Sequence, residues 1–296
     1  MADDEILTAT AADAGFAIVA GITTELVRQT QLRHGLAPTA AAAAGRLITA
    51  TALLGSSLKG SERVSLQISG DGPIGSLSAE AWLVGTGVGA RARARNPLAD
   101  LPLNARGKFD VAGVIGAGAL QVTKSYEVGQ PYVGVVPLYT GEVAEDVASY
   151  LAQSEQIPSI VALGVLANPE GVIAAGGIIA QVLPGADERA IAALEARALA
   201  LPPVTQLIAG GANARALLEA IAGDFELRAE RSTSVRFDCL CTREKVEVAL
   251  LGLGADELLA MARSNEISEA SCEFCSKRYA FTTEELERLT LRFGSE

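Results

Sequence analysis

The sequence predicts an α+β fold in three parts: a mixed α/β N-terminal domain with β-sheets and packed helices, a helical linker, and a small C-terminal module. Three observations support this prediction. Strand-like segments and turns fill the first part, the composition becomes rich in Ala and Leu after Pro184-Gly185, and all four cysteines follow residue 238. At about 150 residues per domain, 296 residues leave room for about two domains. We therefore place the three parts at residues 1–184, 185–234 and 235–296.

The elements of the N-terminal domain are predicted from apolar runs, alternating segments and turn residues. An apolar segment at 38–54 is typical of a helix that begins at Pro38 or Thr39 and ends at Gly55. The other predicted elements are a helix at 142–154 and strand-like segments at 64–68, 74–84, 111–123, 132–139, 160–166 and 172–182. We expect a mixed domain with hairpins and not a regular alternation of strand and helix.

The linker and the end of the chain are predicted to contain short helices. Apolar residues at helical spacing follow Ala186, and Pro202-Pro203 ends that helix. Further helices are expected at 213–221 and at 283–291. Because short helices depend on tertiary contacts for their stability, the order of the linker should depend on its packing.

The charge and hydropathy of the chain exclude several classes of partner. Asp and Glu number 35 against 24 Lys and Arg, which gives a net charge of −11. This excess argues against a nucleic acid as the main partner and gives no support for binding to an anionic membrane. The longest apolar stretch, at 161–183, is interrupted by polar residues and glycines. The acidic start at 1–5 lacks the positive segment of an export signal, so we expect a soluble, cytoplasmic protein.

Two other features favour ordinary structural roles over catalysis. The glycine-rich segment 85–89 precedes an alternating stretch with Arg91, Arg93 and Arg95, so a hairpin loop is favoured over a dinucleotide site. The arginines would form a solvated or ion-paired strand face, with an anion or client site as the alternative. His34 is the single histidine and has no nucleophile motif beside it, so it is interpreted as a surface or helix-end residue. We predict no catalytic residue and no enzyme activity.

The cysteines form the one pattern that is typical of a specific chemistry. Cys239 and Cys241 make a Cys-x-Cys pair, and after 30 intervening residues Cys272 and Cys275 make a Cys-x-x-Cys pair. Two tight pairs suit a tetrahedral Zn²⁺ site with four thiolate ligands. An iron–sulfur cluster is the alternative metal centre, and a role as small apolar residues is the alternative without a metal. In such a short segment, metal binding would supply much of the folding free energy.

The same spacing also permits redox chemistry. Paired cysteines in a reducing cytosol are more often metal ligands or redox-active groups than structural disulfides. Cys-x-x-Cys is the usual redox spacing, and each close pair could form a disulfide once a metal is lost. Four thiolates around Zn²⁺ carry a net charge of −2, which Arg243, Lys245, Lys277 and Arg278 could offset.

At these residues the sequence resembles the heat shock protein 33 family of redox-regulated chaperones. The four cysteines match that family in pair type and spacing, and similar stretches extend over essentially the whole chain. They include residues 70–73, 96–97, 116–124, 139–150, 154–158 and 175–177, with Gln181 and Pro184. One departure is at 91–93, where an Arg-Gly-Tyr-like turn would be expected.

The resemblance implies an ATP-independent holdase that is inactive when reduced and zinc-bound. It implies that Cys239, Cys241, Cys272 and Cys275 ligate one Zn²⁺. It also implies that oxidation forms the disulfides Cys239–Cys241 and Cys272–Cys275, with zinc release. The C-terminal module then unfolds, the linker becomes disordered, and the protein dimerises and holds unfolding clients.

Elementary physical chemistry gives a reason for each implied step. Zinc-linked folding makes the module depend on reduced sulfur, and oxidation removes the ligands. Helices that lose a packing partner melt and expose apolar surface, while the negative charge keeps such a state soluble. Two alternatives are a thiol–disulfide oxidoreductase and a zinc-ribbon nucleic-acid adaptor. Residues 235–296 hold eight Lys and Arg against twelve Asp and Glu, which argues against the adaptor.

Overall fold

The structure is a computed structural model that describes residues 4–168, 170–264 and 267–291. The chain separates into two compact units, Met1–Asp238 and Cys239–Glu296. The α+β class predicted from the sequence is confirmed, with a large sheet, packed helices and four clustered C-terminal cysteines. The boundaries predicted at 184/185 and 234/235 stay a prediction, and the residues of the expected linker lie within the first unit.

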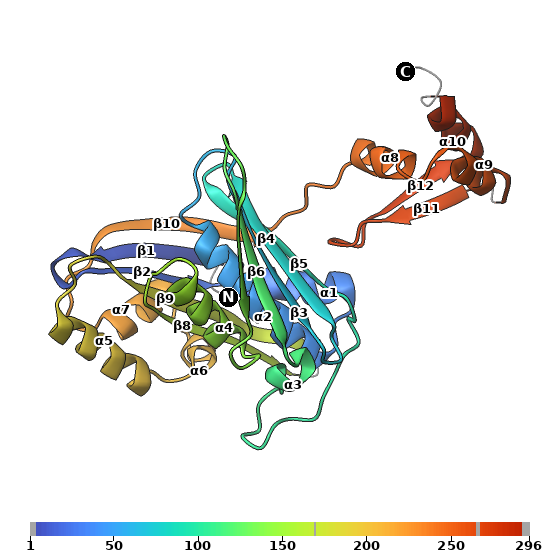
Figure 1. The fold of residues 1–296 in the computed structure, drawn as a ribbon. Coiled ribbons are helices and arrows are strands. Elements are labelled where there is room, and N and C mark those ends of the chain that lie inside the picture. The colour runs from blue at the N-terminus through green and yellow to red at the C-terminus, as the bar shows by residue number, and fades with distance from the viewer. Residues whose placement is uncertain (1–3, 169, 265–266, 292–296) are drawn as a thin grey trace. The chain divides into compact units, whose positions relative to one another are not determined.

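A ten-stranded sheet forms the framework of the first unit (Figure 1). The strand order is β7-β6-β3-β4-β5-β10-β1-β2-β9-β8, and among the described strands of this sheet only the β10–β5 pair is parallel. The strands are β1 (Glu5–Ala11), β2 (Phe16–Ile22), β3 (Arg63–Gly70), β4 (Ser76–Val84), β5 (Gly87–Ala94), β6 (Gly118–Ser125), β7 (Tyr132–Pro137), β8 (Ser159–Asn168), β9 (Gly171–Val182) and β10 (Arg228–Phe237).

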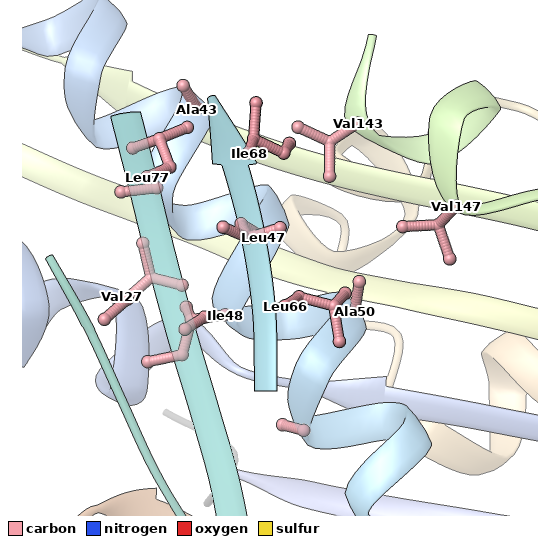
Figure 2. Close-up of a cluster of buried hydrophobic side chains, with 14 of the residues drawn as sticks. Val27, Ala43, Leu47, Ile48, Ala50, Leu66, Ile68, Leu77, Val143 and Val147 are labelled. Carbon is pink, nitrogen blue, oxygen red and sulfur yellow. The ribbon is translucent and has the colours of Figure 1, made fainter. Parts of the chain in front are cut away.

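Helix α2 (Pro38–Gly55) is the centre of the main core. Apart from Arg46 its residues are apolar or small, with many alanines, so neighbouring elements can approach it closely on several sides. It packs against β4, β5, β8 and β9, with α1 (Thr24–His34), α3 (Val111–Ile115) and α4 (Val143–Gln153) beside it. Figure 2 shows Leu47 and Ile48 of α2 among Leu66, Leu77 and other side chains of the surrounding strands and helices.

A second core lies on the other face of β1, β2 and β9. Because side chains alternate along a strand, Ile6 enters the α2 core whereas Leu7 enters this second core. Phe16 and Ile18 of β2 are also fully buried there. The helices that cover this face are α5 (Glu188–Ala200), α6 (Val204–Ala209) and α7 (Ala214–Ala222), all from the expected linker (Figure 1).

The second unit is a small α/β module. A two-stranded sheet of β11 (Ile267–Ser271) and β12 (Arg278–Thr282) packs with α8 (Arg243–Leu251), α9 (Ala255–Ser264) and α10 (Thr283–Thr290). In the part of this unit that the structure describes, the core cluster has seven buried residues, among them Tyr279 and Phe281 of β12. Thr282 and Glu285 form a reciprocal capping box, which explains why α10 begins where the sequence predicts it.

Most of the predicted elements of the first unit are present, but the strand expected at 111–123 is wrong in its first half. Residues Val111–Ile115 form the short helix α3 because the Asp110 side chain accepts a hydrogen bond from the Gly113 backbone N–H. Gly116 then turns the chain with φ of 76°, and β6 follows from Gly118.

Two expectations from the sequence concern a membrane span and an export signal. Within the described residues, no helix combines the length and the apolar character that a membrane span requires. The acidic start used against an export signal includes residues 1–3, which lie outside the described residues.

Candidate metal centre

The structure brings all four cysteines together in the second unit. Cys239 and Cys241 lie in the segment before α8, and Cys272 and Cys275 lie in the turn between β11 and β12. Their four sulfur atoms all lie within 4.8 Å of one another. The Sγ–Sγ distance is 3.8 Å for Cys239 and Cys272 and 3.3 Å for Cys241 and Cys275. Two pairs separated by 30 residues in the sequence therefore form one cluster.

The second pair is presented by a tight turn. The Cys272 backbone N–H donates to the Lys277 carbonyl at 2.9 Å, and the Ser276 N–H donates to the Cys272 carbonyl at 2.9 Å. Ser276 has a φ of 57°, the left-handed conformation that turns the chain back into β12. This hydrogen-bonded loop holds Cys272 and Cys275 at the end of the hairpin.

The first pair is held by the start of α8. The Thr242 hydroxyl accepts from the Lys245 N–H and caps the helix, while the Lys245 ammonium donates to the Leu240 carbonyl at 2.7 Å. Arg243 crosses to the hairpin, where it donates to the Ala280 carbonyl at 2.9 Å and lies 4.3 Å from the centre of the Phe281 ring. These contacts fix the Cys239–Cys241 segment beside the hairpin.

Tyr279 makes a direct contact with the cluster. Its hydroxyl donates a hydrogen bond to Cys241 Sγ at 3.2 Å. Burial acts to raise the pKa of the Cys241 thiol, but the Tyr279 hydroxyl and the neighbouring thiols more than offset it and lower that pKa to about 7. The pKa of the Tyr279 hydroxyl is raised, first by this hydrogen bond and then by burial.

Cys275 has the opposite electrostatic environment. It is buried, whereas the other three cysteines are partly exposed. Burial raises the pKa of the Cys275 thiol, and a hydrogen bond from the Lys277 backbone N–H offsets this only in part. Of these two thiols, Cys241 therefore ionises more readily than Cys275.

The donor set and its dimensions fit a single metal ion. In a tetrahedral zinc site with Zn–S distances of about 2.3 Å, the sulfurs lie about 3.8 Å apart. The Sγ–Sγ distances of 3.3 Å for Cys241 and Cys275 and 3.8 Å for Cys239 and Cys272 are near this value. The four cysteines are therefore close enough to hold one metal ion, and soft sulfur ligands suit Zn²⁺.

The four cations expected to offset the thiolate charge have specific places. Arg243 pairs with Glu285 at 2.8 Å and Arg278 with Glu269 at 3.4 Å. The Lys277 ammonium lies 5.0 Å from the centre of the Tyr279 ring, and Lys245 donates to a backbone carbonyl as described above. The structure thus shows these cations in contact with carboxylates, carbonyls or an aromatic ring.

The other residues singled out in the sequence have structural surroundings in the first unit. The 85–89 segment contains the turn between β4 and β5, as the hairpin prediction requires, with Val84 opposite Gly87. Arg91 pairs with Glu80 at 2.7 Å, in agreement with an ion-paired strand face. His34 is the last residue of α1, a helix-end position as expected. Sequence reasoning missed Tyr279. Its position four residues after Cys275 is only a weak indication of a role at the cluster.

Comparisons with known proteins agree with this fold and this cluster. The model of a family described as Hsp33 protein matches residues 4–282, which include all four cysteines. The mixed α/β unit followed by a four-cysteine unit thus places the chain among chaperone-type proteins with a cysteine cluster. The chain belongs to the Hsp33 protein family.

Individual relatives cover nearly the full chain. A protein named 33 kDa chaperonin from Acetivibrio thermocellus is 41% identical over 289 residues, which are 97% of each chain. Its namesake from Bacillus subtilis is 40% identical, over 97% of this chain and 98% of the relative. The crystal structure of the 33 kDa chaperonin (heat shock protein 33 homolog) from Thermotoga maritima has a TM-score of 0.92 and 34% identity, with full coverage of both chains. These names support a chaperone.

Proposed function

We propose that this protein is a redox-regulated, ATP-independent holdase that binds unfolding client proteins and prevents their aggregation. In the reduced state the four cysteines hold one Zn²⁺ and the chaperone is inactive. Oxidation converts it to the active form. The observation that carries the proposal is the convergence of four sulfurs within 4.8 Å in a unit of only 58 residues.

The proposed ligands are Cys239, Cys241, Cys272 and Cys275. Bound Zn²⁺ would neutralise part of the thiolate charge. It would also cross-link the two arms of the cluster, which are the segment before α8 with Cys239 and Cys241 and the β11–β12 hairpin with Cys272 and Cys275. Among the described residues, the core cluster of the second unit has only seven buried members, so such a link would supply a large share of its folding free energy. The stability of the unit would then depend on the redox state of its sulfurs.

The proposed oxidation removes the ligands in pairs. In each pair, two thiolates lose two electrons to one hydrogen peroxide molecule, which takes up two protons from solvent and is reduced to two waters while one S–S bond forms. We propose the pairs Cys239–Cys241 and Cys272–Cys275, which are adjacent in the sequence. Each disulfide then lacks the thiolates that a metal ion requires.

Loss of the second unit would affect the linker that we propose at 185–234. Strand β10, between α7 and Cys239, pairs with β1 and with β5, and its last residue lies two positions before Cys239. Helices α5 to α7 are short and are anchored by residues such as Leu194, Leu217 and Ile221. Their release would uncover the apolar face formed by Phe16, Ile18 and their neighbours, a surface suited to unfolded chains.

Oxidised chains would form homodimers and bind clients, with no nucleic-acid or membrane partner and no enzyme activity, in the cytoplasm. A net charge of −11 would keep a state with exposed apolar surface soluble.

The decisive experiment measures zinc and chaperone activity on the same samples. Reduced protein should contain one zinc per chain and should not suppress aggregation of a thermally unfolding client. After peroxide treatment with mild heating, zinc should be released and aggregation should be suppressed without ATP. Zinc release with no gain in suppression would contradict the switch, and sustained reduction of a substrate disulfide would favour an oxidoreductase instead.

A further inference from the structure

The hydrogen bond between Tyr279 and Cys241 connects the two arms of the cysteine cluster. Tyr279 lies in β12, opposite Ala270 of β11, and therefore belongs to the hairpin that presents Cys272 and Cys275. Its hydroxyl reaches the sulfur of Cys241, in the other arm, at 3.2 Å. One side chain thus links the hairpin to a sulfur of the first pair.

The ring and the hydroxyl of Tyr279 have separate environments. The ring is part of the core cluster of the second unit, and only 6% of the residue is exposed. Cys241 packs against that same cluster, and Lys277 lies near the ring. Because the packing fixes the ring, the hydroxyl has little freedom to point elsewhere, so the hydrogen bond is preorganised.

We propose that Tyr279 is a positioning residue of the four-cysteine site, whose hydroxyl holds Cys241 Sγ in its ligand position and protects that sulfur from oxidants while metal is bound. This inference rests on the proposed zinc-thiolate switch. It assigns to Tyr279 a part in setting the threshold of that switch.

The physical reason lies in the electron density of the sulfur. A hydrogen bond to a metal ligand orients it, and removal of such outer-shell partners typically lowers metal affinity by about 10- to 100-fold. The donor also withdraws electron density from the thiolate, which makes the sulfur a weaker nucleophile toward peroxide. No bond is broken in Tyr279 and no proton leaves it, so its effect is on orientation and reactivity alone.

The test uses Tyr279→Phe in the full-length, zinc-loaded protein. Phenylalanine keeps the ring in the core and removes only the hydroxyl. We expect zinc affinity, measured by competition with a chromophoric chelator, to fall about tenfold. We also expect the rate of peroxide oxidation at Cys241, followed by alkylation and peptide mass spectrometry, to rise about fivefold relative to that at Cys272.

Tyr132→Phe is the matched control, because it removes a tyrosine hydroxyl that is bonded to Ser154 in the first unit. It should leave both measurements unchanged. Suppose that Tyr279→Phe has the same zinc affinity and oxidation rates as the wild type, and that the wild type binds zinc and releases it on oxidation. The role proposed for Tyr279 is then wrong, while the proposed switch is retained. An equal acceleration at all four cysteines would indicate general loosening and would also overturn the proposal. If the wild type binds no zinc, the proposed function itself fails.

Discussion

The Trp82 indole Nε1 donates a hydrogen bond to Asp238 Oδ2 at 3.1 Å, so the last residue of the first unit is tied to β4. The Asp238 backbone N–H also donates to the Ala90 carbonyl of β5 at 3.0 Å. Asp238 directly precedes Cys239, and these two bonds therefore fix the point at which the chain leaves the sheet.

Replacing Trp82 with Phe should loosen this attachment of Asp238. The change removes the donor and leaves a carboxylate without its partner, which should cost about 1 to 3 kcal/mol of local stability. We expect faster amide hydrogen exchange at residues 235–238, measured by mass spectrometry on the reduced, zinc-loaded protein. Unchanged exchange at Phe237 and Asp238 would show that the β10–β5 pairing alone holds the end of the strand.

The sequence predicts the elements of the first unit wherever the pattern is strong. The apolar run at 38–54 and the alternating strands around 64–84 correspond to α2, β3 and β4. No strand is predicted from the sequence at β1, β2 or β10. β1 and β2 do contain strand-forming Ile, Leu, Val and Phe residues, whereas β10 is mostly polar and exposed. These strands are defined by long-range pairing, such as that of β10 with β1 and β5. A local sequence pattern cannot predict such pairing.

Shortening Leu217 tests whether the linker helices keep the chaperone inactive. Leu217 in α7 is fully buried in the second core, so Leu217→Ala should cost about 2 to 5 kcal/mol. If release of α5 to α7 uncovers the client surface, the reduced variant should already suppress client aggregation, measured by light scattering. Leu199→Ala, at a residue that is 90% exposed, is the control and should behave like the wild type. A destabilised Leu217→Ala variant that stays inactive until oxidised would show that linker order does not control activity.

The cysteine cluster could be predicted because its spacing in the sequence is informative, whereas its surroundings could not. Cys239 and Cys241 approach Cys272 and Cys275 as the two tight pairs suggested. The contacts of Tyr279 and Arg243 depend on how α8 and the hairpin pack together. Sequence proximity suggested that Arg243 offsets thiolate charge, but its geometry joins α8 to β12 and α10.

Arg243→Lys should weaken the second unit although it keeps the charge. Lysine cannot at once donate to the Ala280 carbonyl, pair with Glu285 and stack on Phe281. We expect a loss of about 1 to 2 kcal/mol, seen as faster hydrogen exchange in β12 and α10 of the zinc-loaded protein. Arg278→Lys is the matched control, because the Arg278–Glu269 pair is exposed and should change stability by less than about 0.5 kcal/mol. Both substitutions keep the positive charge. If Arg243→Lys changes stability as little as Arg278→Lys does, Arg243 acts by its charge alone.

Asp4 should make the stability of the first unit depend on pH. Its carboxylate accepts hydrogen bonds from the backbone N–H groups of Glu25 and Leu26 at the start of α1, at 3.0 and 2.6 Å. Burial nevertheless raises the pKa of Asp4 from 3.8 to about 6. Between these values the folded state binds a proton that the unfolded state does not, so this group stabilises the fold increasingly as the pH falls from 7 toward 4.

The measurement is urea unfolding between pH 4.5 and 7.5, followed by the fluorescence of Trp82, which is the single tryptophan and lies in the first unit. Relative to Asp4→Asn, the wild type should gain stability as the pH falls, by at most about 3 kcal/mol over the whole range. Asp13→Asn, which removes an exposed carboxylate beside Arg228, is the control for the change in net charge. A difference between wild type and Asp4→Asn that does not vary with pH would mean that Asp4 stays ionised in the fold throughout, held by its two backbone hydrogen bonds.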